Sequence, residues 1–193
     1  MNEALYDAFQ KTIADDVYVG EAQGHYVIQR INEEDYQLEL KYKVQKEYGV
    51  SFRLEDFKEV ARYLKGGKRA AGTDNDCTMI DGAIFQIEIK RAKSMTHHPV
   101  EKQFAGGKQW LNHIFSLVAA RDNDVLADVS LPIYHLVIQL GNRRPDLTRN
   151  MRVKNDGRHF RTVIRSEDKY VDLSRVMRVL LAKEKCNDVL KIE

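Results

Sequence analysis

Two short apolar runs joined by an Asp-Gly pair constrain the fold of this chain more than any other feature. Residues 77–80 and 83–89 are mostly apolar, and Asp81 and Gly82 lie between them. An Asp-Gly pair between two such runs is a strong local signal for a β-hairpin. The sequence therefore predicts an antiparallel hairpin over residues 76–90, at the centre of a mixed sheet.

Apolar periodicity elsewhere predicts both helices and strands. Spacings of three and four residues indicate helices, whereas alternation or a short continuous apolar run indicates strands. Helices are expected over 3–14, from Leu54 to the glycines at 66–67, over 99–120, and after Ser174, which is expected to cap the last one. Strands are expected at 25–31, 37–44, 133–140, 151–154 and 159–164. We therefore expect an α+β fold, α/β/α-like, with a central mixed β-sheet and flanking helices.

Length and composition are those of a globular protein. The 193 residues are 43% hydrophobic and 31% charged, enough for one domain with its own core. We expect a single domain over 1–193, with a core at about 50–142, a helix and hairpin at 1–49, and a basic hairpin and helix at 143–193. Two cysteines provide no disulfide framework or zinc spacing, and no apolar run is long enough to span a membrane. These features predict a cytoplasmic protein that does not bind a membrane.

Glu88 and Lys90 are the first candidates for a functional site. They are two residues apart on a predicted strand, so their side chains point to the same face, while Ile87 and Ile89 point to the other. An exposed ion pair is the ordinary explanation of such a pair. The apolar strand around it favours burial instead, and buried charges are costly unless they are paired or bind a metal.

Whether Asp76 joins this face depends on the turn. A three-residue loop at 80–82, with Gly82 left-handed, sets Asp76 opposite Gln86 and on the face of Glu88. A two-residue loop turns Asp76 away. We therefore expect the three-residue loop, with Asp74, which has the same parity, as the alternative metal ligand.

Two carboxylates suit a hard divalent cation. With the main-chain carbonyl of Ile89, Asp76 and Glu88 would provide oxygen ligands for Mg²⁺, for which Mn²⁺ is expected to substitute. Such a cation makes water more acidic and neutralises charge on a phosphate. Lys90 would orient the attacking water and stabilise the transition state. This set of groups is sufficient for phosphodiester hydrolysis.

Residues 72–90 resemble the core of PD-(D/E)XK nucleases, and in particular archaeal Holliday-junction resolvases and nuclease-related domains. The shared pattern is a Gly-rich loop, an Asp, two apolar strands with a tight turn, and Glu-x-Lys. The resemblance covers about residues 55–140 and lacks the proline before Asp76. It implies a restriction-endonuclease-like core, with Asp76, Glu88 and Lys90 as the catalytic trio and Gln103 on the next helix supporting the site. It also implies a possible further carboxylate from an upstream helix, for which Glu59 and Glu55 are the candidates, although both are predicted to face solvent.

A concentration of positive charge follows the predicted strand 133–140. Segment 143–165 holds eight basic residues against two acidic ones: Arg143, Arg144, Arg149, Arg152, Lys154, Arg158, Arg161 and Arg165. We interpret this segment as a surface for nucleic-acid phosphates. A solvated hairpin and a subunit contact are the alternatives, and Lys65, Lys68 and Arg69 are another possible path for DNA.

Three other features are assigned structural roles. Glu39-Leu40-Lys41 is a second Glu-x-Lys, but it lies on an alternating strand without a matching hairpin. His97 and His98 are adjacent, which disfavours joint metal binding, and Trp110 is expected in the core.

The sequence as a whole predicts a Mg²⁺-dependent DNA endonuclease. A nucleic-acid-binding or assembly module without catalysis, and a nuclease acting on RNA, are the alternatives. A homodimer is expected, since a two-fold dimer matches the symmetry of duplex DNA. The shape and sequence of the substrate, and the biological role, do not follow from the sequence.

Overall fold

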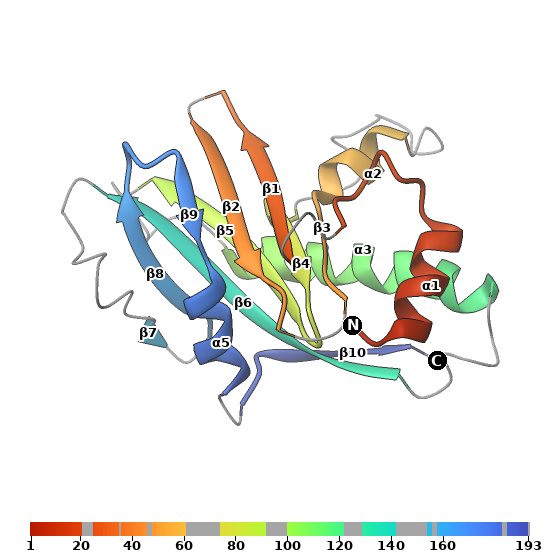
Figure 1. Cartoon of the computed structure of the whole chain (residues 1–193). Helices are drawn as coiled ribbons and strands as arrows, with labels where there is room; N and C mark the ends of the chain where they lie inside the picture. Colours follow the sequence, from red (N-terminus) through yellow and green to blue (C-terminus); the bar gives the residue numbers. More distant parts are fainter. Residues whose placement is uncertain are drawn as a thin grey trace.

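The hairpin predicted from the Asp-Gly pair lies inside a seven-stranded mixed sheet in the computed structural model (Figure 1). The structure describes residues 1–20, 25–34, 36–45, 48–60, 74–91, 100–121, 129–141, 154–155, 158–182 and 185–192. The strands are β3 (Val50–Phe52), β4 (Cys77–Ile80), β5 (Ile84–Arg91), β6 (Val129–Gly141), β7 (Lys154–Asn155), β8 (Phe160–Arg165) and β10 (Asp188–Ile192). Their order is β3-β4-β5-β6-β8-β7, and β10 pairs with β6 off this path. β6 is parallel to both β5 and β8, so the predicted apolar strand 133–140 does lie in the middle of the sheet.

A second, three-stranded sheet covers one face of the first. It consists of β1 (Tyr26–Asn32), β2 (Gln37–Lys43) and β9 (Tyr170–Asp172), in that order. β1 and β2 form the predicted antiparallel hairpin, whereas β9 is parallel to β2. Buried residues of this sheet and of helix α5 (Ser174–Leu181) form one core with the facing side of β4, β5, β6 and β8.

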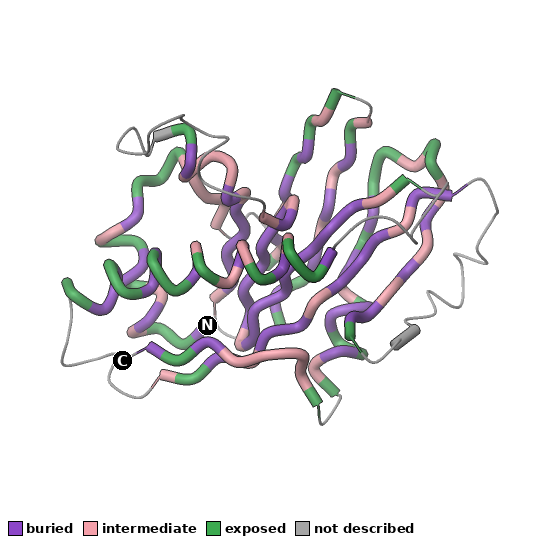
Figure 2. The backbone as a smooth tube through the Cα atoms, turned by 180° about the vertical axis from the view of Figure 1, so that it is seen from behind, coloured by how far each residue is buried: buried purple, intermediate pink, exposed green. Residues whose placement is uncertain are grey.

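Helices cover the opposite face of the seven-stranded sheet. Helix α1 (Glu3–Thr12) and helix α3 (Val100–Arg121) pack there around a second core, and helix α2 (Leu54–Val60) follows β3 directly. Figure 2 shows α3 from this side, crossing the sheet with its buried positions turned inward. The fold is therefore α+β with a central mixed sheet and flanking helices, as the sequence predicts.

The hairpin turn contains three residues, but not the three expected. The loop is Asp81-Gly82-Ala83, and Gly82 has a φ of 68°, a left-handed conformation that glycine adopts without strain. Asp81 N donates a hydrogen bond to the carbonyl oxygen of Ala83 at 2.9 Å. Cys77 consequently opposes Ile87, so Asp76 comes opposite Glu88 rather than Gln86. The expected register was wrong by one loop position, but the face assigned to Asp76 was right.

The C-terminal third differs most from the expectation. β9 and β10 were not predicted, and neither was β3 near the start of the core. Ser174 does not cap α5. It is the first helical residue, and its backbone N–H and hydroxyl both donate to Asp172. Predicted structure within 61–73 and 142–153 falls outside the described residues.

Candidate functional site

Asp76, Glu88 and Lys90 come together on the α3 face of the sheet. Glu88 and Lys90 lie on β5, and the hairpin register brings Asp76 opposite Glu88. Lys90 Nζ forms an ion pair with Glu88 Oε1. Asp76 Oδ2 accepts a hydrogen bond from the backbone N–H of Ile89 at 2.6 Å. The side chains of the predicted trio are thus held side by side.

Glu88 is fully buried. Its side chain has 0% exposure, compared with 19% for that of Lys90. Val100, Phe104 and Val137 form a small apolar cluster, and Val137 is the register partner of Glu88 on β6. An exposed ion pair is therefore excluded, and the carboxylate lies against an apolar wall built by α3 and β6.

This environment raises the pKa of both carboxyl groups. For Glu88 the main cause is burial, followed by the charge of Asp76, while Lys90 and a hydrogen bond with Gln103 act in the opposite direction. For Asp76 the main cause is again burial, opposed by the Ile89 N–H and the charge of Lys90. Two neighbouring buried carboxylates disfavour double ionisation. The interaction with Gln103 places the predicted supporting residue of α3 at the site.

The turn between β1 and β2 brings in further residues that were not predicted. The pKa of Tyr36 is raised mainly by burial and then by the charges of Asp76, Glu33 and Glu88, so its phenol lies near these carboxylates. Arg53 binds Glu33 with 2.6 Å between Nη2 and Oε1, and it also pairs with Glu55. The charges of Glu33 and Arg53 both act on Asp76. No local pattern around the Asp76–Lys90 hairpin reveals these neighbours, because Glu33 and Tyr36 come from the β1–β2 turn and Arg53 from the link between β3 and α2.

A buried amide network sets the distance between α3 and the hairpin. Gln86 Nε2 donates to Asn75 Oδ1 at 3.0 Å and to the carbonyl oxygen of Phe104 at 3.2 Å. A Cβ atom on Gly107 would lie 2.1 Å from Asn75 Oδ1, so α3 approaches this closely only because residue 107 is glycine. Paired glycines inside a helix are unfavourable, and Gly106-Gly107 was a signal of close packing that could have been noticed.

The other proposed metal ligands lie differently. Asp74 forms an ion pair with the buried Lys58 of α2, so its carboxylate is already engaged. Glu59 is exposed on α2, as the helical spacing predicts. Asp56 is the carboxyl group on α2 whose pKa is raised, chiefly by burial, with Arg53 opposing the shift. The side chain of Ile89 belongs to the opposite core, and only its main chain touches Asp76.

The described part of the basic segment adjoins the site. Arg161 is the register partner of Val137, which is itself the partner of Glu88, so these residues form one row across β5, β6 and β8. Arg158 forms an exposed ion pair with Glu101 on α3 at 3.3 Å, and Arg165 pairs with Glu167 at 3.5 Å. Lys154 lies on β7, opposite Arg161. Arg143, Arg144, Arg149 and Arg152 lie outside the described residues, as do Lys65, Lys68, Arg69, His97 and His98.

The residues assigned structural roles do occupy structural positions. Glu39 pairs with Arg30 across the β1–β2 hairpin at 3.3 Å. Lys41 Nζ lies 3.9 Å from the centre of the Tyr26 ring. Trp110 is half-buried and packs against the helix-side core. The second Glu-x-Lys therefore forms surface interactions away from the buried one.

The chemistry of the donor set agrees with a hard cation. Both carboxylate oxygens of Glu88 are buried, and within the described residues their polar neighbours are Lys90, through the ion pair, and Gln103. Among the described residues there is no cluster of three or more His, Cys, Asp or Glu side chains that would enclose a metal. Two carboxylates, a carbonyl oxygen and several waters are the ligands that suit Mg²⁺, which keeps part of its hydration shell.

Comparisons with known proteins leave this site to be interpreted from its own geometry. The chain has no significant match to a family model, a curated protein or a solved structure. No helix within the described residues is both long enough and apolar enough to cross a membrane.

Proposed function

We propose that the protein is a Mg²⁺-dependent endonuclease that hydrolyses phosphodiester bonds in DNA. The observation that carries this proposal is the buried, opposed pair of carboxylates, Asp76 and Glu88, with the Lys90 ammonium beside them. Such a pair is expensive to keep in a folded protein without a cation. The resemblance of residues 72–90 to PD-(D/E)XK nucleases supports the same assignment.

Each residue has a defined task in this mechanism. Asp76, Glu88 and the main-chain carbonyl of Ile89 would hold the cation, and Mn²⁺ is expected to replace Mg²⁺. When bound, the cation supplies positive charge beside the scissile phosphate and makes water more acidic. Lys90 orients the attacking water and stabilises the charge that develops on the phosphate. Gln103 holds Glu88 in position from α3.

The basic residues provide the means to bind DNA. Arg161 lies in the same row of the sheet as Glu88. Arg158 forms an ion pair with Glu101, which lies in the first turn of α3. Side chains scattered over a strand and its turn suit phosphates better than base edges. Since one site cuts one strand, we further propose that a homodimer cleaves both strands of a duplex.

The decisive experiment separates metal binding from cleavage. Plasmid, linear duplex, single-stranded, flap and four-way-junction DNA, together with RNA, are incubated with Mg²⁺ or Mn²⁺. Metal binding is measured independently by calorimetry. Glu88→Gln should lose both metal binding and cleavage, whereas Lys90→Ala should still bind metal but not cleave. Glu39→Ala, which changes the other Glu-x-Lys, should behave as wild type.

The possible results distinguish the alternative functions. Cleavage of RNA in preference to every DNA substrate would favour the ribonuclease. Nucleic-acid binding without cleavage under any condition would favour the binding or assembly module. If Glu88→Gln and Lys90→Ala both cleave like wild type, the assignment of the catalytic site to these residues is wrong.

A further inference from the structure

Gln139 is a polar residue on the central strand β6. Its neighbours Ile138 and Leu140 are buried in the core shared with the three-stranded sheet, so the side chain of Gln139 points to the opposite face. A strand with parallel neighbours on both sides is normally apolar on both faces. Gln139 is half-buried, and within the described residues its amide makes no hydrogen bond. The donor and acceptor groups of this amide are therefore available to a ligand.

The strand register places Gln139 beside Lys90. The two residues are partners in the parallel pairing of β5 with β6, so their backbones are about 5 Å apart at the standard strand spacing. Both side chains leave the same face of the sheet, and that of Lys90 is 19% exposed. Glu88 precedes Lys90 by two residues on this face, with about 8 Å between the backbones of Glu88 and Gln139. Gln139 thus lies at the edge of the carboxylate site.

Two arginines lie on the other side of Gln139. Its register partner on β8 is Val163, and Arg161 and Arg165 come two residues before and after Val163. Ile164 is buried in the opposite core, so both arginines lie on the face of Gln139. Both are half-buried. The amide is therefore flanked by a lysine on β5 and by two arginines on β8, a set of charges that is complementary to a chain of phosphates.

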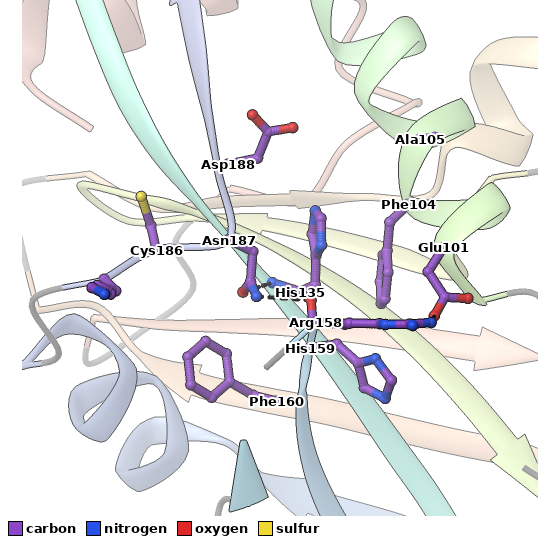
Figure 3. A pocket seen from close by; sticks show the side chains of 11 residues that line it. Glu101, Phe104, Ala105, His135, Arg158, His159, Phe160, Cys186, Asn187 and Asp188 are labelled. Carbon is purple, nitrogen blue, oxygen red and sulfur yellow. Dashed lines mark hydrogen bonds and ion pairs between the residues drawn. The ribbon is translucent and has the colours of Figure 1, made fainter. Parts of the chain in front are cut away.

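This part of the sheet extends beyond α3. In Figure 2 the C-terminal ends of β5 and β6 continue past the first turn of the helix. Helix α3 begins at Val100, which packs on Val137, two residues before Gln139 on the same face. In the cavity beside this turn, Phe104 and His159 are only 2% and 6% exposed (Figure 3). A long ligand that reaches the carboxylates therefore finds accessible polar surface over Gln139 rather than in that cavity.

We infer that the DNA strand crosses the sheet over Gln139, from Lys90 on β5 to the arginines of β8. Nε2 of Gln139 donates a hydrogen bond to a phosphate oxygen at the scissile position, and Arg161 and Arg165 neutralise the phosphates that follow. Glutamine amides are ordinary donors to phosphate oxygens, and such contacts position a nucleic acid without reading its bases. This inference rests on the proposed function and adds both a substrate-binding residue and the direction of the bound strand.

The test changes the charge at position 139 and measures DNA binding in EDTA, where no metal-dependent cleavage occurs. Anisotropy gives the affinity of fluorescein-labelled duplex and single-stranded DNA at several salt concentrations. Gln139→Lys should steepen the slope of log affinity against log salt by about 0.9 for the duplex or about 0.7 for the single strand, because one more phosphate is neutralised. Gln139→Glu should weaken binding about 10- to 100-fold, because like charges about 5 Å apart near a protein surface repel each other strongly.

Gln109 provides the matched controls, because it is an exposed glutamine in the middle of α3. Gln109→Lys and Gln109→Glu change the net charge equally and should alter the affinity less than about 2-fold at 0.1 M salt, where distant charges are screened. Gln139→Leu removes the amide and should weaken binding about 2- to 12-fold. Thermal melts establish that the variants are folded, and a gain of affinity in Gln139→Lys cannot come from misfolding. An unchanged salt slope in Gln139→Lys would overturn the inference.

The outcomes separate this inference from the nuclease assignment. Binding that responds to charge at position 139 but not at 109, in a protein that never cleaves, would support the inferred substrate path and overturn the nuclease. Cleavage in Mg²⁺ by a protein whose binding changes equally at both positions would support the nuclease and overturn the path. Absence of binding of either DNA by wild type would also overturn the path.

Discussion

The carboxylate of Asp76 accepts a hydrogen bond from the backbone N–H of Ile89, with 2.6 Å between Oδ2 and N. This bond ties the start of one hairpin strand to the strand that carries Glu88 and Lys90. It fixes the Asp76 carboxylate at the main chain of β5, next to the strand position of Glu88. The position of the Asp76 carboxylate relative to Glu88 is thus set by the main chain of the hairpin.

The first prediction concerns pH. Burial, followed by the charge of Asp76, raises the pKa of Glu88 to about 8. The folded protein therefore retains a proton that the unfolded chain releases above its ordinary pKa of about 4.3. Glu88 should therefore make the free energy of unfolding of the metal-free protein fall as pH rises from about 5 to 8, by up to about 1.4 kcal/mol per pH unit. Asp76, whose pKa is raised to about 6, should add to this slope below pH 6. Urea titrations at several pH values measure this slope.

Glu88→Gln should flatten that slope, because its amide does not titrate. Glu39→Gln, on the β1–β2 hairpin, should follow the wild-type curve. Mg²⁺ should stabilise wild type more at pH 8 than at pH 5, since it competes with the proton for the same oxygens. A wild-type stability that rises over this window would contradict the assignment of a buried, protonated Glu88.

The second prediction concerns the close approach of α3. Gly107→Ala places a methyl group 2.1 Å from Asn75 Oδ1, so it should destabilise the fold by about 1–3 kcal/mol despite the better helix propensity of alanine. It should also lower cleavage by displacing Gln103. In an Asn75→Ala background the same change should cost less, because the closest clashing atom is absent and only Gln86 Nε2, at 2.5 Å, remains within 3 Å. Additive effects of the two substitutions, measured by denaturant unfolding, would exclude the proposed contact.

The third prediction concerns phosphate contacts. Arg158→Gln should flatten the slope of log affinity for duplex DNA against log salt by about 0.9, and Arg158→Gln with Arg161→Gln by about twice that. The loss should be similar across DNA sequences, because phosphates carry no sequence information. Arg30→Gln is a matched control: Arg30 is 78% exposed and Arg158 77%, and each pairs with a glutamate at 3.3 Å. An equal change in Arg30→Gln would show that net charge alone is being measured.

The fourth prediction concerns the turn. Asp81 is fully buried, and its Oδ2 accepts a hydrogen bond from the backbone N–H of Gln45 at 2.5 Å. Asp81→Ala leaves that amide without its partner and should cost about 1–3 kcal/mol of stability. Cleavage per folded molecule should remain near wild type, because the turn lies at the opposite end of the hairpin from Asp76. A specific loss of cleavage in a stable Asp81→Ala protein would instead give this residue a functional role.

The sequence was most informative where a single pattern determined the geometry. The Asp-Gly pair located the hairpin. A three-residue loop then placed Asp76 on the same face of the sheet as Glu88 and Lys90. The exact register did not follow, because Gly82 can occupy more than one position in such a loop. β9 contains only three residues, too few for periodicity to appear, and β10 does not alternate strictly because Val189 and Leu190 are adjacent apolar residues. Tyr36 was missed because only the packing of one sheet on the other brings it to the site. Arg53 was missed because its position depends on β3, a strand that was not predicted, pairing with β4.

The pairing of β2 with β9 also affects how the protein is made. β2 lies between β1 and β9, so it is an edge strand until residues 170–172 have left the ribosome. Unpaired strand edges associate with other chains, and contacts between distant parts of a chain form slowly. Residues 129–133 of β6 likewise lack their pairing partner until β10 has been synthesised. Newly synthesised chains therefore complete both sheets late, and lower temperature or slower expression should increase the yield of soluble protein.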